Sequence, residues 1–178
     1  PAGAVFRISA TDAPNVNGAR DLGFAVGRGN DGPADLGSLR TAVEGGGVKA
    51  LYVVDPGPDG SIGDVSWVVA ARRSGKLLLL IVQGVVMTDL AAAADIVLPG
   101  AAWVEKDVIY TNDQGRVQAA SQAIAPPGEA REDWQILADL ARSLGVAMPY
   151  KSSSDVRLAI SAALPGSKYA DAPKLAFA

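Results

Sequence analysis

The chain has 178 residues and a formal net charge of −3, with 49% hydrophobic and 20% charged residues, which is typical of a globular domain with a real core. It contains no cysteine and no histidine. Within this chain the composition therefore excludes Cys-ligated iron–sulfur clusters, Cys/His zinc sites, and Ser-His-Asp or Cys-His catalysis.

The patterns of charge and hydropathy argue against two further classes of protein, those that bind nucleic acid and those that span a membrane. No run of Lys and Arg is present, so nucleic acid is not an expected partner. The longest strongly apolar run, residues 77–82, is far shorter than the roughly 20 residues of a membrane-spanning helix, so no span is expected. The chain opens with Pro and shows no signal-peptide pattern, which predicts an excised or processed piece of a longer protein.

The first quarter of the chain gives mixed signals. Residues 4–9 predict a short strand, and residues 11–23 predict a loop because Pro, Asn and Gly recur there. After a glycine-rich stretch, a helix is predicted from about residue 36 to 44, with Asp35 as its cap. Three consecutive glycines at 45–47 end this helix.

Strand and helix patterns then alternate, which indicates an α/β fold with a parallel sheet flanked by helices. The middle strand is apolar at every position, which is typical of a central strand covered on both faces. The predicted elements are a buried strand at 50–54, a helix at 64–74 with Trp67, Val68 and Ala71 on one face, the central strand at 77–82, a helical turn at 91–94 and a strand at 95–98.

In the second half of the chain, the alternation of strands and helices gives way to a hairpin followed by helices. Residues 108–111 and 116–118 flank an Asn-Asp-Gln-Gly turn and predict a β-hairpin. A helix is predicted from about 131 to 144, and its apolar residues recur at three- and four-residue spacing, namely Trp134, Leu137, Leu140, Ala141 and Leu144. Another helix is predicted from 153 to 164. We therefore expect one domain over residues 1–164 and a loosely ordered tail over 165–178.

Residues 27–32 match the dinucleotide-binding pattern G-x-G-x-x-G, and Asp55 follows the next strand, where such a fold holds the ribose. Pro33 follows the last glycine, where it would remove a hydrogen bond from the helix that this pattern requires. A loop is therefore the preferred interpretation of this stretch. A stand-alone nucleotide-binding module stays open as an alternative function.

Candidate ligand-binding residues lie after the predicted parallel strands. Asp55 and Gly57 follow one strand, and Gln83 and Gly84 follow the next. Open α/β sheets bind ligands at the carboxyl ends of their strands. With Asn112 and Arg116 of the hairpin, these residues are the predicted contacts if a pterin or nucleotide is bound. No catalytic residue and no metal ligand is predicted.

Residues 94–134 carry a longer pattern. They contain ADIVLP, then EKDVIYTNDQGRVQ, then PPGEAREDW. This resembles the molybdopterin oxidoreductase superfamily, whose pattern is ADVVLP, E-K-x-G-T-x-x-N-x-E-G-R-x-Q and P-P-G-x-A-x-x-D-W. It is most similar to the large iron–sulfur G chain of bacterial NADH:quinone oxidoreductase, respiratory complex I, and corresponds to a fragment of its C-terminal half.

The resemblance implies a structural domain that supports electron transfer without a redox centre of its own. Its partners would be the cluster-bearing domains of the same parent chain and neighbouring complex subunits, in the cytoplasm at the inner membrane. The parent family carries iron–sulfur clusters, whereas this chain would hold no cofactor, the molybdopterin having been lost.

Two departures from the catalytic relatives support that loss. Asp55-Pro56-Gly57-Pro58 stands where their pattern resembles G-x-N-P, and Val108-Ile109 replaces the Gly-Thr pair. The alternative is a piece of a true molybdopterin enzyme, such as a formate dehydrogenase, that contributes loops to the pterin dinucleotide site.

Overall fold

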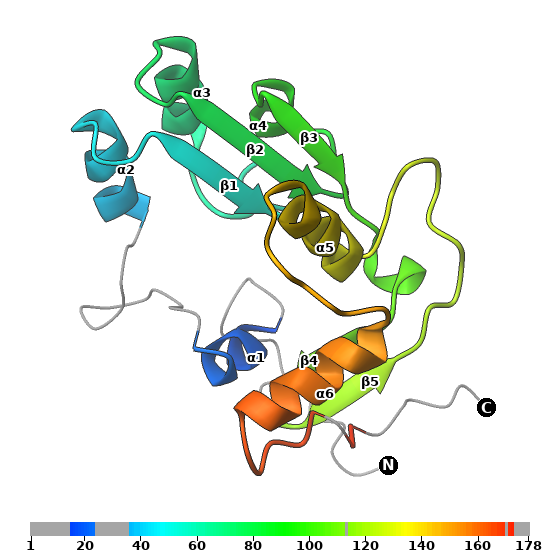
Figure 1. Ribbon diagram of the computed structural model, residues 1–178. Coiled ribbons are helices and arrows are strands. Elements are labelled where there is room, and N and C mark those ends of the chain that lie inside the picture. The colour runs from blue at the N-terminus through cyan, green and yellow to red at the C-terminus, as the bar shows by residue number, and fades with distance from the viewer. Residues whose placement is uncertain (1–14, 24–35, 113, 170, 173–178) are drawn as a thin grey trace, which may run out of the picture.

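The structure, a computed structural model, describes residues 15–23, 36–112, 114–169 and 171–172. The strand expected at residues 4–9, the G-x-G-x-x-G stretch and the Asp35 cap lie outside these residues. Figure 1 shows two groups of elements, a parallel sheet with helices and a hairpin with helices, and α5 lies between them.

The parallel sheet confirms the predicted α/β fold. Its strands are β1 (Ala50–Val54), β2 (Leu79–Gly84) and β3 (Ile96–Pro99), in the order β1-β2-β3 and all parallel. Three helices alternate with them, α2 (Leu36–Glu44), α3 (Ser66–Arg73) and α4 (Asp89–Ala92). α3 contacts both other helices, and α4 contacts β2. The predicted helices and strands are therefore confirmed, with ends that shift by a few residues.

The main core lies between the helices and one face of this sheet. Trp67, Val68 and Ala71 are buried together, as their helical spacing predicted. The strand side contributes Leu80 and Val82, with the remaining members Val43, Leu77, Leu90 and Ala91. These side chains exclude water from one face of the sheet, which stabilises the parallel layer.

Two burial predictions for this sheet are wrong. β1 was expected to be buried, but it is an edge strand whose middle residues are half-buried and whose ends are exposed. β2 was expected to be covered on both faces, yet Leu79 and Ile81 are only half-buried. An apolar sequence indicates that both faces can be covered, and the described residues cover one.

The second group is built on the antiparallel hairpin of β4 (Val108–Thr111) and β5 (Val117–Ala120), which confirms the hairpin prediction. The last helix, α6 (Ser153–Ala163), begins after Ser152, whose side chain accepts a hydrogen bond from the Asp155 backbone. A separate small core packs here, made of Val117, Ala119, Tyr169 and Ala172 with Ile109, Ile160 and Leu164.

Helix α1 (Val16–Asp21) corrects the loop predicted for residues 11–23. Long-range polar contacts hold it against the hairpin. The Asn15 side chain accepts a hydrogen bond of 2.8 Å from the Thr111 backbone, and the Asn17 side chain donates one of 2.9 Å to the Asn112 carbonyl. Isolated helices of this length are not stable in water, so local sequence could not predict it.

The predicted tail contributes two buried residues. Tyr169 and Ala172 belong to the hairpin core, and the Tyr169 hydroxyl donates a hydrogen bond of 3.0 Å to Asp21. These two residues are packed rather than loosely ordered. The domain boundary at residue 164 stays a prediction.

Helix α5 (Asp133–Ser143) begins at the carboxyl end of the sheet. Gly100 bridges to Arg131, whose carbonyl accepts a hydrogen bond of 2.8 Å from the Ala101 backbone. The predicted apolar stripe of this helix is wrong in detail, because Ile136 and Ala138 are its buried residues while Leu144 is exposed. A short 3-10 turn, η1 (Trp103–Glu105), precedes β4.

Candidate functional site

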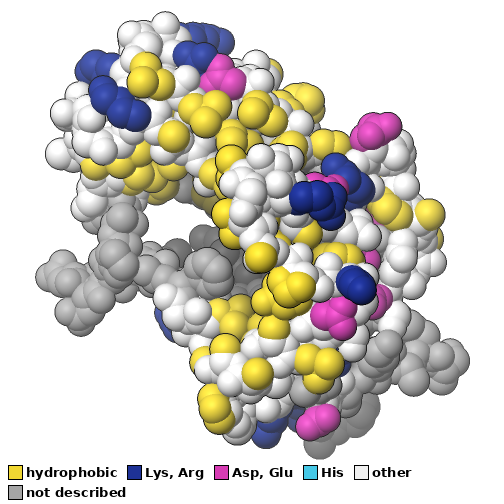
Figure 2. Space-filling model, viewed as in Figure 1, with side chains coloured by type: hydrophobic (Ala, Val, Ile, Leu, Met, Phe, Trp, Pro, Cys, Tyr) yellow, Lys and Arg dark blue, Asp and Glu magenta, His cyan; other side chains and the backbone are white. Residues whose placement is uncertain are grey.

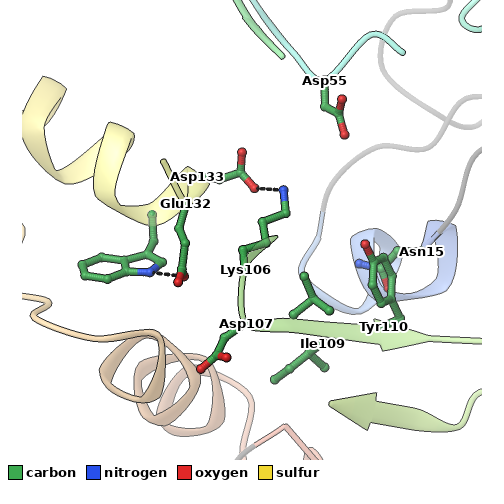
Figure 3. Close-up of a pocket in the computed structure, with 10 residues that line it drawn as sticks. Asn15, Asp55, Lys106, Asp107, Ile109, Tyr110, Glu132 and Asp133 are labelled. Carbon is green, nitrogen blue, oxygen red and sulfur yellow. Dashed lines mark hydrogen bonds and ion pairs between the residues drawn. The ribbon is translucent and has the colours of Figure 1, made fainter. Parts of the chain in front are cut away.

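A pocket of about 380 Å³ lies where the sheet, α5 and the hairpin meet. Four segments supply its wall, which are Asn15 just before α1, the end of β1, the residues that lead into and form β4, and the start of α5 (Figure 3). Its lining residues are Asn15, Asp55, Lys106, Asp107, Val108, Ile109, Tyr110, Glu132, Asp133 and Trp134. The pocket thus lies at the carboxyl ends of parallel strands, where open α/β sheets bind ligands.

Asp55 stands at the end of β1 and faces this pocket (Figure 3). Its φ is 46°, a left-handed conformation that costs a non-glycine residue about 1–3 kcal/mol. The backbone N–H of Asp55 donates a hydrogen bond of 2.7 Å to the Gln83 carbonyl, which extends the pairing of β1 with β2 by one residue. The turn of the chain at the end of β1 therefore holds the Asp55 carboxylate at the pocket.

Asp133 connects the sheet to the pocket. Its Oδ1 accepts a hydrogen bond of 2.6 Å from Gln83 Nε2, and its Oδ2 forms an ion pair of 2.6 Å with Lys106 Nζ. Gln83 is fully buried, and its Oε1 accepts a hydrogen bond from the Tyr52 hydroxyl. This polar network of Tyr52, Gln83, Asp133 and Lys106 satisfies both ends of the buried amide, as buried polar groups require.

Two tyrosines near the network have raised pKa values. Burial raises the pKa of Tyr52, and the negative charge of Asp133 raises it further. Burial is also the main reason that the pKa of Tyr110 is raised, while the nearby Lys106 opposes the shift. Both phenols therefore stay protonated at neutral pH and act as neutral hydrogen-bonding groups, not as bases.

The charge of the lining is strongly negative. Among the residues that the structure describes, four carboxylates line the pocket, those of Asp55, Asp107, Glu132 and Asp133, and Lys106 is the one cation. That ammonium is already paired with Asp133. A phosphate or pyrophosphate group brought here would meet like charges, and no described lining residue offers an unpaired cation, which disfavours its binding.

Two of the other carboxylates hold the wall of the pocket together. Asp107 accepts hydrogen bonds of 2.9 Å from the Gln122 backbone and from the Ser153 hydroxyl, so it ties the hairpin to α6. Glu132 accepts a hydrogen bond of 2.6 Å from the indole N–H of Trp134. Both carboxylates are thus engaged by donors of the protein itself.

The structure places the predicted ligand contacts in different surroundings. Asp55 lines the pocket, and Gln83 lies behind it in the polar network. Gly84 lies against Pro56, and an added Cβ there would come within 3.4 Å of the proline ring. Gly57 has a φ of 68° and turns the loop after β1.

The two hairpin candidates lie apart from this pocket. The Asn112 side chain accepts hydrogen bonds of 2.9 Å from the backbone N–H groups of Gln114 and Arg116, so it shapes the turn. Arg116 is exposed. Neither residue lines the pocket that Asp55 faces. Whether any of the predicted contacts binds a cofactor stays a prediction.

Sequence reasoning missed Asp133, which binds Gln83, and Lys106, which pairs with Asp133. Lys106 and Asp133 both belong to the motif-bearing stretches EKD and EDW, and that pattern was the available signal for them. Trp134, the first residue of the predicted apolar stripe, is half-buried on the pocket wall. Arg131 forms an ion pair of 2.5 Å with Asp139, eight residues further along the chain.

Two classes of site are not found in the described part of the chain. Among those residues, no group of three or more carboxylates is arranged to hold a metal ion. No helix that the structure describes is long and apolar enough to cross a membrane.

Comparisons with known proteins identify the relatives of this chain. A family model described as molybdopterin oxidoreductase matches residues 12–143. The F420-dependent formate dehydrogenase subunit alpha of Methanocaldococcus jannaschii is 46% identical over 101 residues, which is 57% of this chain and 15% of that protein. The mitochondrial NADH-ubiquinone oxidoreductase 78 kDa subunit of Candida albicans is 46% identical over 78 residues, 43% of this chain and 11% of that protein.

A solved structure shares the fold. Acetylene hydratase from Pelobacter acetylenicus matches with a TM-score of 0.58 and 24% identity, over 78% of this chain and 20% of that chain. The likeness shows the fold alone. The chain spans between 11% and 16% of the length of the curated relatives.

Proposed function

This chain belongs to the molybdopterin oxidoreductase family, and we propose that it forms a structural α/β domain of a longer, complex I G-like subunit. In this role it supports electron transfer by holding cluster-bearing domains of the same subunit and neighbouring subunits in place. It carries no redox centre itself. The assembly would lie in the cytoplasm, peripheral to the inner membrane through a respiratory complex.

The acidic pocket at the carboxyl end of the sheet is the observation that carries this proposal. The pterin dinucleotide of the family is anionic because of its pyrophosphate, and binding it requires unpaired cations or free backbone N–H groups. Here four carboxylates face one lysine that is already paired. The residues present do not fit the group, so no step of a reaction is assigned to them.

The polar network supports the same conclusion. Gln83 is the buried residue at the end of the central strand. Its side-chain amide donates a hydrogen bond to Asp133 and accepts one from the Tyr52 hydroxyl. A ligand that used Gln83 would first have to break a buried hydrogen bond, at a cost of about 1–3 kcal/mol. The network thus holds α5 against the end of the sheet through hydrogen bonds that a ligand would have to replace.

A second candidate function rests on the comparisons. The similarity to an F420-dependent formate dehydrogenase subunit alpha extends over 101 residues, more than the 78 residues shared with the NADH-ubiquinone oxidoreductase subunit. On this alternative the parent is a molybdopterin enzyme such as a formate dehydrogenase, and the loops at Asp55 and Gln83 contribute to the cofactor site.

Metal content and intact mass of the native protein distinguish the two functions. The protein would be captured from its source with an antibody to this domain. We expect a chain much larger than the 18.1 kDa of these residues, with iron and with neither molybdenum nor tungsten. Molybdenum or tungsten in stoichiometric amount would reject the structural proposal in favour of the second function.

A pair of variants in the parent protein sharpens the test. Asp55→Asn changes the pocket carboxylate, while Asp59→Asn changes an exposed acid in the same loop. A structural domain predicts the same bound-metal content in both variants as in the wild type. If Asp55 contacts a pterin cofactor, Asp55→Asn alone would change the content of molybdenum or tungsten.

A further inference from the structure

One face of the parallel sheet has no helical layer among the described residues. Side chains alternate along a strand, so Leu51, Val53, Leu80 and Val82, which pack toward the helices, define the covered face. The register pairs Tyr52 with Ile81 and Ile81 with Ile96, so these three side chains lie on the opposite face.

That opposite face, here called the open face, is uncharged across its three strands. β1 contributes Ala50, Tyr52 and Val54, β2 contributes Leu79, Ile81 and Gln83, and β3 contributes Ile96 and Leu98. Val54 is 49% exposed and Ile96 is 44% exposed. Figure 2 shows hydrophobic side chains gathered on the molecular surface over the sheet.

Helix α5 covers only the carboxyl end of the open face. Gln83 is fully buried there because Asp133 of α5 binds it, whereas Ile81 and Leu79, two and four residues earlier, are half-buried. Figure 1 shows α5 beside the tips of the strands, with α3 and α4 on the far side of the sheet. The amino-terminal half of the open face therefore remains in contact with solvent in the described chain.

We propose that the open face is the docking surface for an amphipathic helical layer from another part of the same polypeptide. Parallel sheets are stable when both faces are covered, usually by helices. This chain spans at most 16% of its curated relatives, so most of a related polypeptide lies outside it and can supply that layer.

The chemistry of the open face favours a permanent neighbour. Interfaces that form and dissociate carry charged residues, whereas the cores of permanent interfaces are depleted of charge. In the described strands, no charged side chain lies on this face. The inference rests on the proposed function only in requiring a parent chain that is longer than these residues.

Thiol labelling in the parent protein tests this docking. The chain has no cysteine, so Ile96→Cys introduces a single thiol into this region, and peptide mass spectrometry reports its modification. Ser143→Cys, at the exposed end of α5, is the control that shows that the reagent reaches the folded domain. We expect the thiol at position 96 to react at least about 100-fold more slowly in the native parent than in denaturant.

Each other outcome overturns the proposal in a distinguishable way. Labelling at position 96 as fast as in denaturant would show that the open face is in contact with solvent. Protection that appears only in the assembled complex would assign the face to another subunit, and protection lost on dilution of the parent would assign it to a second copy. A native protein of only 18.1 kDa would reject the proposed function as well.

Discussion

Replacement of Asp133 by alanine is the sharpest test of the polar network. The carboxylate accepts hydrogen bonds from Gln83 and Lys106, each at 2.6 Å. Without it, the fully buried Gln83 amide loses its acceptor, which costs about 1–3 kcal/mol. The Lys106 ammonium, on a side chain that is 12% exposed, loses its counter-charge. Because solvent screens Asp133, which is 38% exposed, the loss of the ion pair with Lys106 adds only roughly 1 kcal/mol to this cost.

The expected loss in free energy of unfolding is therefore about 2–4 kcal/mol. Asp139→Ala is the matched control, because Asp139 lies on the same helix, is also 38% exposed and pairs with two cations, Arg131 and Arg142. Both of those arginines are more than half exposed. The control should cost no more than about 1 kcal/mol, as exposed ion pairs do.

Urea unfolding followed by far-ultraviolet circular dichroism measures both variants. Asp133→Asn keeps an acceptor for Gln83 but loses the charge, so its stability should lie between that of the wild type and that of Asp133→Ala. Equal losses for Asp133→Ala and Asp139→Ala would refute the reasoning, because the burial of the partners would then have no effect.

Three further predictions concern the sheet and its ends. Asp55→Gly relieves a φ of 46° and should raise the free energy of unfolding by about 1 kcal/mol in urea titrations, whereas Asp55→Ala should not. Arg72 lowers the pKa of Asp95 from 3.8 to about 2, so this pair stabilises the fold above pH 4 and the contribution is lost as pH falls through 2. Acid titration of Asp95→Asn should therefore show a shallower loss of stability between pH 4 and pH 2, and an unchanged slope would contradict this. Leu80→Ala, in the core, should cost about 2–5 kcal/mol in thermal or urea unfolding, while Leu78→Ala, at a side chain that is 63% exposed, should cost less than about 0.5 kcal/mol. Similar losses at the two leucines would mean that the covered face is misassigned.

Local patterns in the sequence determined most of the elements. The helix at Leu36–Glu44 and the strand at Ala50–Val54 have the predicted bounds, because three glycines follow the helix and Asp55-Pro56 follows the strand. The hairpin was visible in its Asn and Gly turn residues, and the motif from residue 94 onward indicated the family. These features are encoded by neighbouring residues, so a single sequence suffices to read them.

The candidate site was only partly visible. Asp55 and Gln83 were predicted because they follow parallel strands, and a sheet brings such positions together. Asp133, which binds Gln83, and Lys106, which pairs with Asp133, lie 50 and 23 residues beyond Gln83, on a helix and on a turn that no local pattern orients toward the sheet. Their roles depend on how α5 docks.

Tertiary packing also decided which apolar residues are buried. The sequence by itself determined that a central strand lies here, since residues 77–82 are all apolar and β2 is the middle strand of the sheet. It could not determine that the described residues would cover only one face of this strand, because burial depends on elements that approach from elsewhere in the polypeptide. Likewise, α1 forms because Asn15 and Asn17 bind the hairpin some 95 residues away, an interaction that the local sequence of a six-residue helix does not encode.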